Sequence, residues 1–64
     1  MKVRDVIKRI RADGWIQIDQ TGDHRQYKHP MKRGKVTVAG QMSDELKPKT
    51  LRSIWRQAGL EPKR

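Results

Sequence analysis

The spacing of apolar residues changes twice along this 64-residue chain, and this change constrains the fold more than any other feature. Near the N-terminus, apolar side chains recur with the i, i+3, i+4, i+7 spacing of one helical stripe: Val3, Val6, Ile7 and Ile10. The same spacing returns near the C-terminus: Leu51, Ile54, Trp55 and Ala58. We therefore predict a helix over about residues 3–12 that Gly14 ends, and a second helix from Pro48 to Gly59. The last four residues, 61–64, are expected to fray.

Between the two helical stripes the pattern changes to alternation, which is typical of strands with one buried face. We expect strands over 15–20, 24–29 and 35–39, with a turn at 21–23 and a short hairpin connection at 31–34. In the first strand, alternation places Ile16 and Ile18 on the buried face and Gln17 and Asp19 on the other. Residues 40–47 have the composition of a loop with one apolar anchor, Leu46. The prediction is an α+β fold of order αβββα in a single domain over 1–64. Its three-stranded antiparallel sheet carries two helices on one face.

Composition narrows the class of protein. Hydrophobic residues make up 33% of the chain, so the core is expected to be thin, and the absence of Cys excludes disulfides and thiolate zinc sites. The formal charge of +9, from 16 Lys and Arg against 7 Asp and Glu, attracts polyanions. Nucleic acid is the leading candidate partner. The charge alone does not exclude two alternative partners, an acidic protein and an anionic membrane surface. No apolar run is long enough to span a membrane and no signal peptide is evident, so we expect a cytoplasmic protein.

Two histidines lie in the second predicted strand, and the odd separation of His24 and His29 points them to opposite faces. They cannot share a metal, and the carboxylates are scattered, so no metal is expected. If Tyr27 packs inward, Arg25 and His29 point inward with it. The open face then holds His24, Gln26 and Lys28, and neighbouring strands add Gln17, Asp19, Lys35 and Thr37.

An exposed imidazole in such a cationic patch has two interpretations. It can take a proton from a ribose 2′-hydroxyl at neutral pH without any metal, which would make the protein an enzyme. Alternatively, His24 is a surface residue that only contacts a phosphate.

Further cations follow the two predicted helices. Lys49, Arg52 and Arg56 lie on one side of the second helix and are candidates to follow a phosphate backbone, with a solvated face as the alternative. The first helix carries a similar stripe, which we interpret as a solvated face: Arg4, Lys8 and Arg11. The two tryptophans fit the core better than a base-stacking role.

Four segments carry a resemblance to a known family: Gly14-Trp15, GDHRQYKHP at 22–30, GKVTV at 34–38 and ELKPKTLRSIWRQAGL at 45–60. In order and spacing they resemble HicA toxins over nearly the whole chain. The resemblance implies a double-stranded-RNA-binding-like αβββα fold. It also implies a ribosome-independent mRNA interferase of a type II toxin-antitoxin system, neutralised by a HicB antitoxin, with no cofactor.

The resemblance also implies roles for single residues. The family's catalytic histidine, in a Gly-Ser-His motif, corresponds to His24, whereas His29 matches a recurrent position that is not catalytic. Two departures stand out: Asp23 replaces the usual serine, and a second histidine that many members carry after the third strand is missing. The general acid is therefore unassigned, with water or Lys35 as candidates. Lys28 is a candidate to stabilise the phosphorane. The expected RNA-binding residues are Lys28, Gln26, Lys35, Lys49, Arg52 and Arg56. A non-catalytic RNA-binding module of the same fold is the alternative.

Overall fold

Two helices and three strands follow one another in the predicted order in the computed structural model, which describes residues 1–60. The elements are α1 (Val3–Ala12), β1 (Ile16–Thr21), β2 (His24–Lys28), β3 (Lys35–Ala39) and α2 (Pro48–Ala58). The strands form one antiparallel sheet in the order β1-β2-β3. The predicted αβββα fold is confirmed, and the expected frayed end lies outside the described residues.

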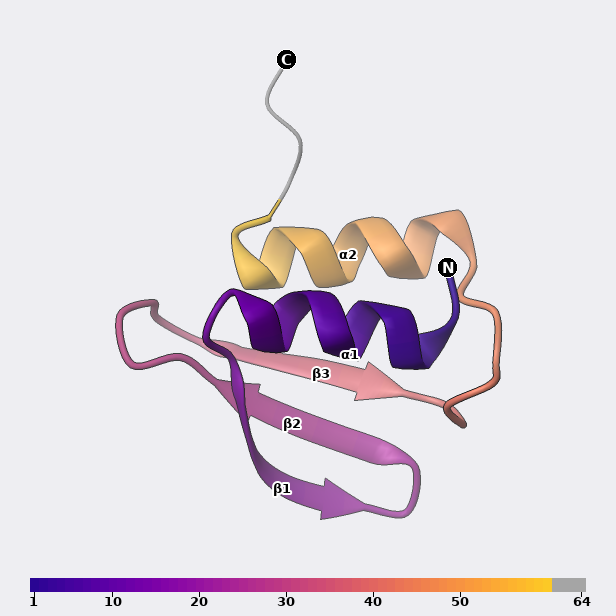
Figure 1. The fold of residues 1–64 in the computed structure, drawn as a ribbon, viewed down its shortest axis with the longest axis horizontal. Coiled ribbons are helices and arrows are strands. Elements are labelled where there is room, and N and C mark those ends of the chain that lie inside the picture. The colour runs from indigo at the N-terminus through magenta and orange to yellow at the C-terminus, as the bar shows by residue number, and fades with distance from the viewer. Residues whose placement is uncertain (61–64) are drawn as a thin grey trace.

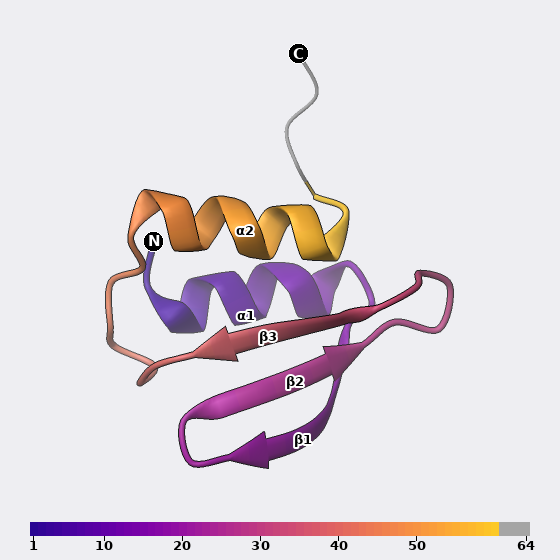
Figure 2. The same ribbon diagram turned by 180° about the vertical axis from the view of Figure 1, so that it is seen from behind.

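The helices and the sheet are arranged so that β1 is left uncovered. Figure 1 shows α1 and α2 side by side and running in the same direction, with β1 at the sheet edge farthest from them. The opposite view agrees (Figure 2). At the other edge, α2 lies along β3, where the backbone N–H of Thr37 donates to Gln57 Oε1 at 3.4 Å. One sheet edge is therefore covered, and the other is free.

Both helices end as the glycines predict. Gly14 has φ 109° and Gly59 has φ 70°, conformations that favour glycine. The N–H of the next residue then donates back into the last helical turn, from Trp15 to Ile10 O at 3.1 Å and from Leu60 to Trp55 O at 2.8 Å. These turns direct the apolar residue after each helix toward the core, where Trp15 is 1% exposed. The prediction that both tryptophans belong to the core is confirmed for Trp15. Trp55 is partly buried and packs against the core from its edge.

The core lies between the helices and the inner face of β2 and β3. Its members come from both predicted helical stripes and from alternate strand positions: Val3, Val6, Ile7, Ile10, Trp15, Tyr27, Val36, Val38, Ile54 and Ala58. Leu46 joins its edge as the predicted loop anchor. Burial of one large apolar side chain stabilises a fold by about 1.5–3 kcal/mol. Because the core contains so few of them, we expect the free energy of unfolding to be small.

The predicted burial of the first strand is wrong. Ile16 and Ile18 are 60% and 49% exposed, because neither of the two described helices covers β1 and because its register shifts between Gln17 and Asp19. Gln17 pairs with Tyr27 and therefore lies on its inner face, where the Tyr27 hydroxyl donates to Gln17 Oε1 at 3.4 Å. Past the shift, Asp19 returns to the open face as expected. Of the two residues of β1 assigned to the open patch, Gln17 is thus misplaced.

Candidate functional site

The turn between β1 and β2 presents His24. Gly22 adopts φ 59° in this turn, and His24 is the first residue of β2, paired with Thr21 on one side and Ala39 on the other. Its side chain is 63% exposed. Its position at a strand end, between two small neighbours, leaves the imidazole open to a large ligand.

Asp23 supplies the charged group nearest to this imidazole. One carboxylate oxygen, Oδ1, lies 3.6 Å from His24 Nε2, and both side chains are more than half exposed. Exposed pairs of this kind contribute little to stability. They can still hold the ring with Nε2 toward Asp23, and Nδ1 then has no partner among residues 1–60. One ring nitrogen is thus available to exchange a proton with a substrate.

Arg25 anchors the turn from the inner side of the sheet. It is 8% exposed, and its Nη1 donates to the backbone carbonyls of Asp23 at 3.2 Å and Gly40 at 2.8 Å. The backbone N–H of Gly40 also donates to Asp23 O at 3.2 Å. The guanidinium therefore ties the backbone before His24 to the end of β3. Alternation correctly predicted that Arg25 points inward, but sequence reasoning missed this anchoring role.

The other open-face residues of β2 lie as predicted, but not all of them are close to His24. Gln26 pairs with Thr37 and is half-buried, whereas Lys28 is exposed and pairs with Lys35. Lys28 lies four positions after His24 along the strand, which corresponds to about 13 Å of backbone. The two lysines therefore form a separate cationic pair at the far end of β2.

The cations of α2 are also apart from His24. Lys49, Arg52 and Arg56 are exposed on that helix, which lies beyond α1 and β3 when viewed from β2 (Figure 1). Of the predicted RNA-binding residues, only Gln26 is near the imidazole in the strand register.

His29 has the opposite environment. Its side chain is 9% exposed, and its Nε2 lies 2.6 Å from Asp13 O. Its Nδ1 accepts the N–H groups of Met31 at 2.9 Å and Lys32 at 3.2 Å. Because Nδ1 accepts these two N–H groups, Nε2 is the ring nitrogen that donates, and its acceptor is Asp13 O. An edge-on contact with Trp15, at 5.3 Å between ring centroids, completes its packing.

Lys32 extends this cluster to both helix ends. Its Nζ donates to Asp13 Oδ2 at 2.6 Å and to Ala58 O at 3.0 Å. The hydrogen bond from Lys32 holds the pKa of Asp13 below its ordinary value of 3.8. His29 and Lys32 thus fasten the β2–β3 connection to the C-terminal ends of α1 and α2. These contacts give His29 a structural role.

Among the described residues there is no group of three His, Cys, Asp or Glu side chains placed to hold a metal ion. Neither described helix is long and apolar enough to cross a membrane.

The fold and the site together define a small basic αβββα domain with an exposed imidazole at one end of its sheet. The family model described as the HicA toxin of bacterial toxin-antitoxin systems matches residues 3–60. The chain therefore belongs to the HicA toxin family. No curated protein matches it.

Proposed function

We propose that this toxin is a metal-independent endoribonuclease in which His24 exchanges protons with the RNA. The exposed imidazole beside Asp23 is the observation that carries the proposal, and membership of the HicA family supports it. The formal charge of +9 supports an anionic substrate. The proposed substrate is mRNA.

The proposed reaction uses the RNA's own 2′-hydroxyl as the nucleophile. His24 takes the 2′-hydroxyl proton, O2′ bonds to the adjacent phosphorus, and the bond from phosphorus to the 5′-oxygen breaks. A water molecule protonates the leaving 5′-oxygen in this scheme, and the hydroxide that remains takes the proton from His24, which restores the neutral imidazole. Water is chosen because Lys35 pairs with Lys28 at the far end of β2. For the same reason Lys28 binds a neighbouring part of the strand and not the reacting phosphate. The products are a 2′,3′-cyclic phosphate and a 5′-hydroxyl end.

Incubation of the purified protein with an mRNA in excess EDTA tests this function. We expect cleavage fragments that end in a 2′,3′-cyclic phosphate, because the scheme needs no metal ion. A protein that binds the RNA and leaves it intact in EDTA would instead be a non-catalytic RNA-binding module. Cleavage that appears only after Mg²⁺ is added would contradict the role of His24.

Neutralisation by a HicB-type antitoxin is the second part of the proposal. Family membership suggests an antitoxin partner, and the exposed end of the sheet around His24 offers a small rigid surface that such a protein can cover. Acidic or neutral antitoxin residues would then lie close to His24.

Chemical-shift mapping of the complex tests this arrangement. We expect the largest changes at the turn around His24 and along the open face to Lys28. The variant Lys28→Glu should weaken the complex mainly through slower association, because it reverses a charge on that face. Changes confined to α2, with His24 still open to solvent, would show that inhibition takes another route.

A further inference from the structure

We propose that the outer side of α1 is a second contact surface for the RNA strand and guides it toward His24. The inference rests on the proposed function, because it concerns the substrate of that reaction. Two neighbouring grooves carry it, together called the α1 groove. The first, about 330 Å³, is lined by Arg4, Ile7, Lys8, Arg11 and Met42. The second, about 680 Å³, is lined by Arg11, Gly14, Trp15, Ile16, Gln17 and Pro30.

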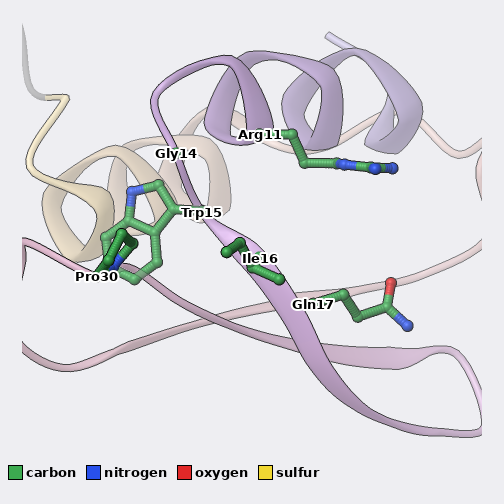
Figure 3. Close-up of a pocket in the computed structure, with 6 residues that line it drawn as sticks. All are labelled: Arg11, Gly14, Trp15, Ile16, Gln17 and Pro30. Carbon is green, nitrogen blue, oxygen red and sulfur yellow. The ribbon is translucent and has the colours of Figure 1, made fainter.

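The two grooves form one surface because Arg11 lines both. Figure 3 shows the side chains of Arg11 and Gln17 extending to the same side of the chain, with Ile16 between them. Arg11 thus joins a groove along α1 to one at the start of β1. The uncovered position of β1, with Ile16 exposed, keeps the second groove open.

The charge of the α1 groove is positive throughout. Arg4, Lys8 and Arg11 are exposed, and none forms an ion pair within residues 1–60. No carboxylate lines either groove. The helical rise of 1.5 Å per residue spreads the three charges over about 10 Å. A line of unpaired cations attracts a phosphate backbone.

The apolar content of the α1 groove favours this occupant over a protein. The exposed apolar side chains that line it are Met42 in the first groove and Ile16 and Pro30 in the second, and the three cations lie along α1 between them. The buried core of a protein interface is usually depleted in charged residues, which is the reverse of this arrangement.

One end of the α1 groove adjoins the turn that carries His24. The backbone N–H of Arg4 donates to Met42 O at 3.1 Å, and Met42 follows two residues after Gly40. Gly40 in turn donates to Asp23 O, directly before His24. In Figure 1 the N-terminal end of α1 and the β1–β2 turn lie toward the same end of the molecule. A strand held on α1 can therefore pass around this end of the sheet to the imidazole, which lies on the face away from the helices.

Charge-neutralised variants test the proposal in the cleavage-dead His24→Ala background. The first combines Arg4→Gln, Lys8→Gln and Arg11→Gln. The matched control removes the same charge from α2, with Lys49→Gln, Arg52→Gln and Arg56→Gln. All six side chains are exposed and glutamine favours helix, so both variants should fold, which circular dichroism checks.

The readout is the affinity for a single-stranded RNA of about 20 nucleotides, measured over a range of salt concentrations. We expect the α1 variant to bind about tenfold more weakly and to lose about two from the slope of log affinity against log salt. The α2 control should keep most of the affinity.

Equal losses of RNA affinity in both variants would mean that only the net charge of the protein matters. An α1 variant with normal RNA affinity would show that the α1 groove does not bind RNA. An α1 variant that binds RNA normally and loses an acidic antitoxin would make the groove a protein-docking surface. Each of these three outcomes overturns the proposal.

A dinucleotide substrate separates this inference from the proposed function. With His24 present, the α1 variant should cleave a dinucleotide at the rate of the unmodified protein, because so short a substrate does not need the α1 groove. A loss of that activity would place the three cations in the chemistry and overturn the guiding role. If the unmodified protein cleaves no RNA in EDTA, the proposed function fails. The binding comparison would still show whether the α1 groove binds RNA.

Discussion

Replacing His24 with alanine should lower the rate of RNA cleavage by about 10²–10⁴-fold, the usual contribution of one acid–base group. The structure gives a reason to expect this loss without unfolding. The His24 side chain is 63% exposed, and its one charged contact among residues 1–60 is the exposed Asp23 carboxylate. Single-turnover rates on one RNA, with circular dichroism of each variant, measure the effect.

The conservative variant His24→Gln is the control for this result. Glutamine keeps a polar side chain that can hydrogen-bond but does not titrate, so it should be as inactive as alanine. A folded His24→Ala protein that cuts RNA within a few-fold of the parent would refute the role of the imidazole. Recovery of activity by glutamine alone would mean that His24 positions the RNA and does not exchange a proton.

Replacing Arg25 with leucine should destabilise the domain by about 3 kcal/mol and abolish cleavage. The guanidinium is buried and donates to two backbone carbonyls, those of Asp23 and Gly40. Hydrogen bonds from a charged group contribute about 1.5–3 kcal/mol each. The Gly40 carbonyl would lose its Arg25 partner, whereas Asp23 O would keep the N–H of Gly40. In a domain of this size such a loss removes most of the stability. Urea unfolding gives the free-energy difference.

Arg33 provides a matched control for this prediction. Its side chain is exposed in the β2–β3 connection, so Arg33→Leu makes the same change in charge and volume without loss of an anchor. We expect the free energy of unfolding of Arg33→Leu to lie within about 0.5 kcal/mol of the parent value. Equal stability of the two leucine variants would show that Arg25 does not hold the turn.

The elements were predictable because each has a local signal. The apolar stripe over Val3–Ala12 and the glycine after it define α1 without any distant contact. Alternation correctly separated exposed His24 from nearly buried His29, which directly follows β2, because that strand is regular and central. In β1 alternation gave the wrong faces for Ile16 and Gln17. Alternation cannot reveal the register shift in this strand or the fact that α1 and α2 leave it uncovered.

The parts of the site that were not predictable depend on contacts between distant residues. Arg25 reaches Gly40 across 15 positions, and Lys32 reaches Ala58 across 26. The stripe along α1 looked like an ordinary solvated face in the sequence. Its neighbours Met42 and Ile16, brought there by the fold, make it a groove.

The most direct test of the central claim removes the attacking group from the substrate. Once a cleavage site has been mapped in EDTA, the nucleotide before the broken bond is replaced by its 2′-deoxy form. If His24 activates the 2′-hydroxyl, cleavage at that bond should disappear, while binding to the His24→Ala protein stays unchanged. Cleavage of the deoxy substrate at the same bond and a similar rate would contradict the account, because the nucleophile would then be something other than the 2′-hydroxyl.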